Sequence, residues 1–173
     1  MIKQLLEQGY YKTVDTDAFE LIDVYSVTWT DEGTVPLQMV VRSPATQQAL
    51  MDTQRWLGEK YLKPVFGDYH CDYCDLVKGM DENVYEWHND YELDKVNLGI
   101  LLYFSDTDES TGTDVQFRIA TTKQPTGSFY PKAGDVAFLN HTVNFEHLVT
   151  AQKIKLPRIV ASFHYHVNYE KIK

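Results

Sequence analysis

The sequence predicts a mostly β domain with flanking helices, and the simplest such architecture is a jelly roll. From Cys74 onward, short apolar runs alternate with turns that contain Gly, Asn, Asp or Pro. Many short strands at such a spacing are typical of jelly rolls and related antiparallel folds. The last apolar run, from Pro157 to Tyr169, alternates cleanly between two classes of side chain, as a strand with two different faces does.

The first part of the chain predicts two strands and a helix. Residues Phe19 to Trp29 are rich in strand formers, and a second apolar run from Val35 to Val41 follows a polar turn. Ser43 and Pro44 then begin a predicted helix, because Ser caps helices and Pro suits their first position. Apolar residues recur at helical spacing to about Leu62 and predict a face packed on a sheet.

Length and composition predict one domain. The 173 residues are 43% hydrophobic, which is enough for a core that stands without disulfides. We expect residues 1–73 to form an α+β cover and residues 74–173 to form the jelly-roll core. The chain has no apolar run of about eighteen residues, and Glu7 interrupts its N-terminus, so we expect neither a membrane span nor a secretory signal. A cytoplasmic, reducing setting follows as the default.

The charge of the chain argues against nucleic acid as a partner. The formal net charge is −9, and Lys and Arg form no stripe, so the surface would repel phosphate backbones. The 12 Tyr, 8 Phe and 3 Trp have no basic residues interleaved, which favours core and pocket wall over base stacking. Peptides, proteins and small molecules remain open as partners, and the oligomeric state cannot be read from the sequence.

Cys71 and Cys74 form a C-x-x-C pair with His70 beside it. A single pair lacks the further two ligands of a structural zinc site, and no βαβ pattern surrounds it as in thioredoxin-like redox sites. We expect two ordinary reduced cysteines, and metal or redox chemistry on a loop remains the alternative.

His88-Asn89-Asp90, followed by His147 and Arg158, is the most informative pattern in the chain. Side chains two residues apart on a strand share a face, so His88 and Asp90 can hold one ion. With His147 as the third ligand, two imidazoles and one carboxylate leave the opposite positions of a metal open. That arrangement is typical of non-haem Fe(II) oxygenases. A solvated strand can also carry an H-x-D triplet without any metal, so the surrounding segments matter.

These surrounding segments carry a family resemblance. The relevant motifs, in chain order, are Val84 to Tyr91, Leu101 to Phe104, Thr111 to Thr113 with Phe117, Pro131 to Asp135 with Phe138, and Glu146 to Val149. From Tyr85 to Val167 the chain resembles the prolyl-4-hydroxylase-like branch of the 2-oxoglutarate/Fe(II) dioxygenases. It departs from that pattern at the turn, which has one Gly where the family often has two. Val160 stands where some branches place a Ser.

The resemblance implies a double-stranded β-helix, the cupin-like form of the jelly roll, with a metal at its open end. Its expected cofactors are Fe(II) and 2-oxoglutarate, with O₂ as cosubstrate and ascorbate as a further candidate. The implied activity is hydroxylation of an unactivated C–H bond of a peptidyl residue such as proline, with release of succinate and CO₂. A dioxygenase acting on a free amino acid or small metabolite and a non-enzymatic binding module remain the alternatives.

Arg158 is the candidate ligand for the distal carboxylate of 2-oxoglutarate. If its face of the last strand lines the barrel, its planar guanidinium can bind that carboxylate in two hydrogen bonds, with Ser162 and His164 as neighbours. The hydroxyl of Tyr103 could add a third bond. A buried ion pair with an acidic side chain is the alternative role for Arg158. Tyr85 has the opposite parity from His88 and is a secondary candidate.

His147 is preferred over His141 as the third metal ligand. His141 lies in Asn140 to Asn144, which reads as a loop, whereas apolar neighbours fix the register of His147 on a strand. We expect a short antiparallel return to the last strand, so that His147 and Arg158 face one cavity.

Overall fold

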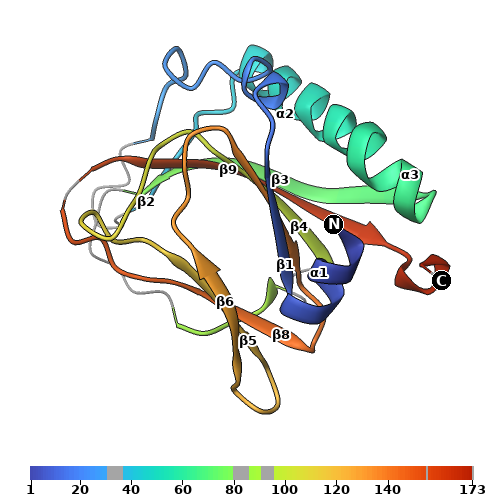
Figure 1. The fold of residues 1–173 in the computed structure, drawn as a ribbon. Coiled ribbons are helices and arrows are strands. Elements are labelled where there is room, and N and C mark those ends of the chain that lie inside the picture. Colours follow the sequence, from blue (N-terminus) through green and yellow to red (C-terminus); the bar gives the residue numbers. More distant parts are fainter. Residues whose placement is uncertain (31–36, 80–85, 91–95, 155, 173) are drawn as a thin grey trace.

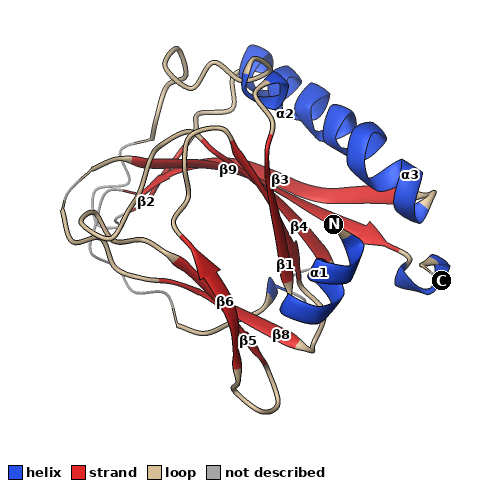
Figure 2. Ribbon diagram, in the orientation of Figure 1, coloured by secondary structure: helices blue, strands red, loops and turns tan. Residues whose placement is uncertain are grey.

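Two facing antiparallel sheets form the body of the fold, with helices on the outer side of one of them (Figure 1, Figure 2). The computed structural model describes residues 1–30, 37–79, 86–90, 96–154 and 156–172. Its helices and helical turns are α1 (Ile2–Gln8), η1 (Asp17–Phe19), α2 (Pro44–Leu57), η2 (Gly58–Leu62), α3 (Lys63–Phe66) and η4 (Tyr169–Lys171). Its strands are β1 (Tyr10–Val14), β2 (Leu37–Met39), β3 (Tyr69–Gly79), β4 (Leu98–Tyr103), β5 (Val115–Ile119), β6 (Pro125–Phe129), β7 (Asp135–Asn140), β8 (Phe145–Val149) and β9 (Arg158–Val167).

The strand order confirms the predicted jelly roll. The larger sheet has the order β1-β7-β4-β9-β3-β2, and the smaller sheet has the order β6-β5-β8. Neighbouring strands in both sheets are antiparallel. The boundary expected after residue 73 falls inside β3, so the N-terminal part of the chain contributes strands to the larger sheet as well as the helices that cover it.

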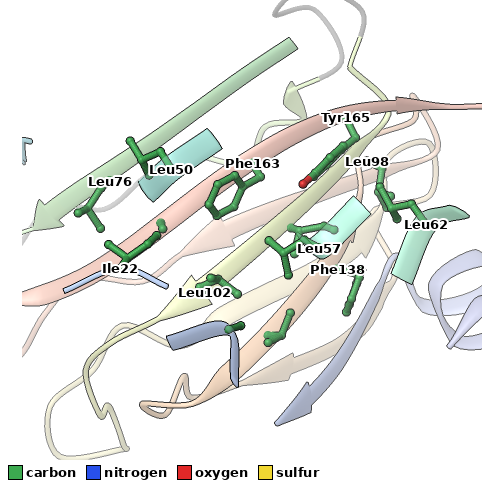
Figure 3. Packing of buried hydrophobic residues seen from close by; sticks show 14 of the residues in the cluster. Ile22, Leu50, Leu57, Leu62, Leu76, Leu98, Leu102, Phe138, Phe163 and Tyr165 are labelled. Atoms are coloured by element: carbon green, nitrogen blue, oxygen red, sulfur yellow. The ribbon is translucent and has the colours of Figure 1, made fainter. Parts of the chain in front are cut away.

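One core lies between the helices and the larger sheet. Leu50 and Leu57 of α2 share a buried cluster with Phe163 and Tyr165 of β9 (Figure 3). Burying such side chains stabilises a fold by roughly 1.5–3 kcal/mol each. This packing covers one face of β9 and leaves its other face toward the smaller sheet.

A second core fills the space between the two sheets. It contains Tyr103 of β4, Phe117 of β5 and Val160 of β9. Since Val160 lies in this core while Ala161 and Phe163 lie in the helix-side core, the two faces of β9 alternate as the sequence predicts. Arg158, which has the parity of Val160, therefore starts on the face between the sheets.

The predicted helix is present and begins where the sequence indicates. The side chain of Ser43 accepts a hydrogen bond of 3.1 Å from the backbone N–H of Thr46, and Pro44 occupies the first turn. After Leu57 the chain continues through the π-helical turn η2 to Leu62. Among the described residues, no helix has the length and apolar character needed to cross a membrane.

The prediction of a strand from Phe19 to Trp29 is wrong. This segment begins at the end of the 3₁₀ turn η1 and continues as turns and irregular chain, in which Trp29 alone makes a bridge, to Val40. The carboxylate of Asp23 accepts a hydrogen bond from the N–H of Tyr25 at 3.1 Å, and its carbonyl accepts one from Ser26. Such local bonds of an Asp compete with strand pairing. The second predicted strand is present as β2, although residues 35 and 36 lie outside the described part.

Candidate metal centre

A two-residue antiparallel bridge places two histidines side by side. The backbone N–H of His88 donates to the carbonyl of His147 at 3.1 Å, and the N–H of His147 donates to the carbonyl of His88 at 2.8 Å. Directly paired residues of antiparallel segments present their side chains on the same face. The two imidazole ring centres accordingly lie 4.3 Å apart.

The carboxylate of Asp90 completes a cluster with these two rings. Its Oδ1 lies 3.7 Å from Nε2 of His88, and its Oδ2 lies 3.9 Å from Nε2 of His147. One potential ligand atom from each of the three residues lies within 4.8 Å of the others. The fold thus brings together the three side chains that the H-x-D spacing and the distal His suggested as ligands. The strand expected for His88 and Asp90 is absent from the described residues 86–90, where His88 makes only an isolated bridge.

Both imidazoles can coordinate a metal through a ring-nitrogen lone pair. The Nδ1 of His88 lies 2.7 Å from the carbonyl oxygen of Glu86, so a proton on Nδ1 leaves the lone pair on Nε2 toward Asp90. Burial lowers the pKa of His147 to about 3, which keeps its ring neutral. Neutral imidazole is the form that coordinates metal.

Arg118 joins the two histidine segments beside the cluster of candidate metal ligands. Its Nε donates to the carboxylate of Glu146 at 2.6 Å, and its guanidinium carbon lies 4.1 Å from the ring centre of Trp87. Trp87 precedes His88 and Glu146 precedes His147, so one guanidinium contacts the neighbour of each histidine. The combined ion pair and cation–π contact supports the bridge from one side.

Arg158 and Tyr103 form a second polar group between the sheets. The guanidinium carbon of Arg158 lies 5.5 Å from the ring centre of Tyr103. The Nε of Arg158 and the hydroxyl of Tyr103 are both buried without a hydrogen-bond partner. Burial raises the pKa of Tyr103 to about 12, partly offset by the charge of Arg158, so its hydroxyl keeps its proton. Two buried donors without an acceptor fit an anion.

Of the two remaining candidate ligands of 2-oxoglutarate, the structure describes only Ser162. Ser162 lies on β9 opposite Leu101 and has the parity of Arg158, so it faces the space between the sheets. Tyr85 lies outside the described residues. His147 and Arg158 reach the space between the sheets from opposite sides, because β8 pairs with β5 while β9 pairs with β3 and β4. The expected antiparallel pairing of the His147 strand with the last strand is therefore wrong. The chain instead crosses from the smaller sheet to the larger sheet between β8 and β9.

His141 differs from the sequence-based expectation. It follows β7 directly, its residue surface is 1% exposed, and its N–H donates to the carbonyl of Asn97 at 3.1 Å. The expected loop between β7 and β8 is present, but its residue His141 is buried and anchored to the sheet. Its Nε2 lies 3.4 Å from Oδ2 of Asp90, and its ring is parallel to that of His164. The sequence carries one signal of this burial. Gly99 lies inside an apolar strand, where a glycine often marks the close approach of another group, here the ring of His141.

Comparison with solved structures identifies the fold. A 2OG-Fe(II) oxygenase family oxidoreductase from Burkholderia pseudomallei is 14% identical with a TM-score of 0.69, covering 94% of this chain and 88% of that one. HygX from Streptomyces hygroscopicus, with nickel, 2-oxoglutarate and hygromycin B bound, is 12% identical with a TM-score of 0.70, covering 97% and 86%. A Pseudomonas putida prolyl-4-hydroxylase is 15% identical with a TM-score of 0.58, covering 96% and 97%.

This chain has the fold of the 2OG-Fe(II) oxygenases over nearly its whole length, which confirms the fold implied by the sequence resemblance. No protein-family model matches the chain, and no curated protein matches it in sequence. The shared architecture is thus visible in the comparison of structures and not in the comparisons of sequence.

The two candidate third ligands are separated by a pair of substitutions. His147→Ala should weaken Mn²⁺ binding by more than about a hundredfold, because even the hydrogen-bond partners of ligands contribute about 10–100-fold. His141→Ala should retain most of that binding. The metal content of the purified variants and Mn²⁺ titration measure both effects, and the reverse order of affinities would move the third ligand to His141.

Arg118→Ala should weaken Mn²⁺ binding by about tenfold, since it frees the neighbours of both histidines without removing a ligand. Lys123→Ala is the matched control, because Lys123 also binds Glu146, at 2.9 Å, yet is more exposed. Metal titration and thermal unfolding are measured together. An Arg118→Ala chain that melts earlier but binds Mn²⁺ like the unaltered protein would assign Arg118 a purely structural role.

Proposed function

We propose that this chain is an Fe(II)- and 2-oxoglutarate-dependent dioxygenase that hydroxylates an unactivated C–H bond and releases succinate and CO₂. The observation that carries the proposal is the presence of two polar clusters, each of which lacks a binding partner. One is the cluster of His88, Asp90 and His147, and the other is the pair Arg158 and Tyr103, which lacks an acceptor. The first suits a metal and the second suits an anion.

The proposed iron ligands are His88, Asp90 and His147. Two neutral imidazoles and one carboxylate would hold a divalent ion such as Fe(II), Mn(II) or Ni(II) and would leave positions for exchangeable ligands. Asp90 remains mostly buried, with a side chain 15% exposed, so it retains a strong attraction for a cation. HygX, with nickel and 2-oxoglutarate bound, supports the same cofactors on this fold.

Arg158 and Tyr103 are the proposed ligands of the distal carboxylate of 2-oxoglutarate. The guanidinium can donate two parallel hydrogen bonds and the protonated phenol a third, which satisfies both buried donors at once. Ser162, on the same face of β9, is the proposed polar neighbour. Because these side chains belong to strands packed on both faces, they would hold the cosubstrate in a fixed orientation.

When bound, iron and 2-oxoglutarate supply the oxidation chemistry. The side chains of this protein would position the metal and the cosubstrate and keep water out of the site. Phe117 and Phe129 lie beside Tyr103 in the inter-sheet core and keep the anion site apolar around its polar contacts. A dry surrounding strengthens the hydrogen bonds that fix the cosubstrate.

The proposed substrate is a peptidyl residue such as proline. The Pseudomonas putida prolyl-4-hydroxylase, which shares this fold along 96% of the chain, supports this choice. The second candidate is a small molecule, favoured by HygX, whose structure with hygromycin B has the higher TM-score of 0.70. Both candidates require the same iron and cosubstrate site.

A reducing, cytoplasmic setting is part of the proposal. Cys71 and Cys74 are free thiols, and burial raises the pKa of Cys71 to about 12, so it carries little thiolate. Unreactive thiols together with ferrous iron suit a reducing compartment.

Succinate release tests the proposal directly. Purified chain supplied with Fe(II), 2-oxoglutarate, ascorbate and O₂ should form succinate, and a panel of proline-containing peptides and small metabolites should stimulate this release when one of them is the substrate. His88→Ala should abolish the release, since it removes a metal ligand. A chain that binds 2-oxoglutarate and iron but forms no succinate with any panel member would favour a binding module.

Arg158→Ala should weaken 2-oxoglutarate binding by more than about tenfold, because losing a charge-assisted bidentate pair costs about 2–4 kcal/mol. Tyr103→Phe should have a smaller effect, and Mn²⁺ binding should survive both changes. Calorimetric titration of 2-oxoglutarate into the Mn²⁺-loaded variants gives the affinities. Unchanged affinity in Arg158→Ala would place the carboxylate elsewhere.

A further inference from the structure

His141 is a buried imidazole to which the proposed function gives no role. Both of its ring nitrogens are buried and lack a hydrogen-bond partner, while the residue is 1% exposed. Leaving polar atoms buried and unpaired is unfavourable, and such atoms commonly bind a water or an ion. A ligand that accepts the lone pair of one His141 nitrogen would remove part of this penalty.

Asp90 and His164 stand around the unpartnered ring. The Nε2 of His141 lies 3.4 Å from Oδ2 of Asp90, and the ring of His164 lies parallel to it, 5.5 Å between centres. One potential ligand atom of each residue lies within 4.8 Å of the other two. Two imidazoles and one carboxylate with a further open position form a donor set that zinc takes in proteins.

The larger sheet leaves space for this cluster at one position. Gly99 of β4 pairs with His164 of β9, and a Cβ at Gly99 would lie 2.2 Å from Nε2 of His141. Any side chain at this position would displace the imidazole from Asp90. With the backbone of His141 bound to Asn97 as well, the cluster is held by the sheet and does not depend on a mobile surface side chain.

We propose that Asp90, His141 and His164 form a second metal site, which binds a borderline transition-metal ion such as Zn²⁺ and shares Asp90 with the iron site. The two sites together offer four imidazoles but one carboxylate. Two dications bound side by side would repel each other with little negative charge between them. The sites are therefore occupied in alternation, and zinc at the second site withdraws Asp90 from iron.

Zinc titration of a chain without the iron site tests the second site. Metal-free His88→Ala/His147→Ala protein should bind one Zn²⁺ per chain by calorimetry. Adding His141→Ala or His164→Ala to this background should weaken zinc binding by about a hundredfold or more. His166→Ala is the matched control, because His166 lies two residues beyond His164 on the same face of β9 but is exposed. It should leave the zinc affinity unchanged.

Absence of zinc binding in the His88→Ala/His147→Ala protein overturns the proposal. Equal zinc affinity with and without His141 and His164 overturns it too, and leaves water as the partner of His141. If circular dichroism shows that the double variant is unfolded, the same comparison is made in His88→Ala alone, since the side chain of His88 is 39% exposed and its removal disturbs little packing. None of these variants is assayed for succinate, so the result stands or falls separately from the proposed dioxygenase activity.

Discussion

The candidate metal centre depends on the antiparallel bridge between His88 and His147. Two backbone hydrogen bonds, of 3.1 and 2.8 Å, join a short segment outside the named strands to the middle of β8. This bridge sets both imidazoles on one face and brings Asp90 to them two residues later. A bridge of two bonds is short, and the contacts of Arg118 with Trp87 and Glu146 add a second link between the two segments.

Both sheets contribute residues to the candidate site. The smaller sheet contributes His147, and the larger sheet contributes Arg158, Tyr103 and His164 from its paired central strands β4 and β9. Because helix α2 covers the outer face of the larger sheet, the inner face of β9 is free to carry polar residues. One strand therefore serves the hydrophobic core with one set of side chains and the candidate site with the alternate set.

Unsatisfied polar atoms mark the same region. Tyr103, His141 and Arg158 each bury at least one polar side-chain atom without a partner. Each such atom costs a fold about 1–3 kcal/mol of stability, a cost found at binding sites more often than in ordinary cores. A carboxylate at Arg158 and a cation beside His141 would reverse these costs, which couples ligand binding to the stability of the fold.

Local patterns determined much of this protein. Strand spacing predicts the jelly roll, Ser43 and Pro44 predict where the long helix begins, alternation predicts the inward face of β9, and the H-x-D spacing predicts the pairing of His88 with Asp90. These features depend on neighbours in the chain, so they can be read from the sequence. The tertiary structure alone decided that β8 and β9 lie in different sheets, that His141 is buried over Gly99, and that Arg118 joins the two histidine segments. Such contacts join residues far apart in the chain, and periodicity along one strand carries no information about what packs against it.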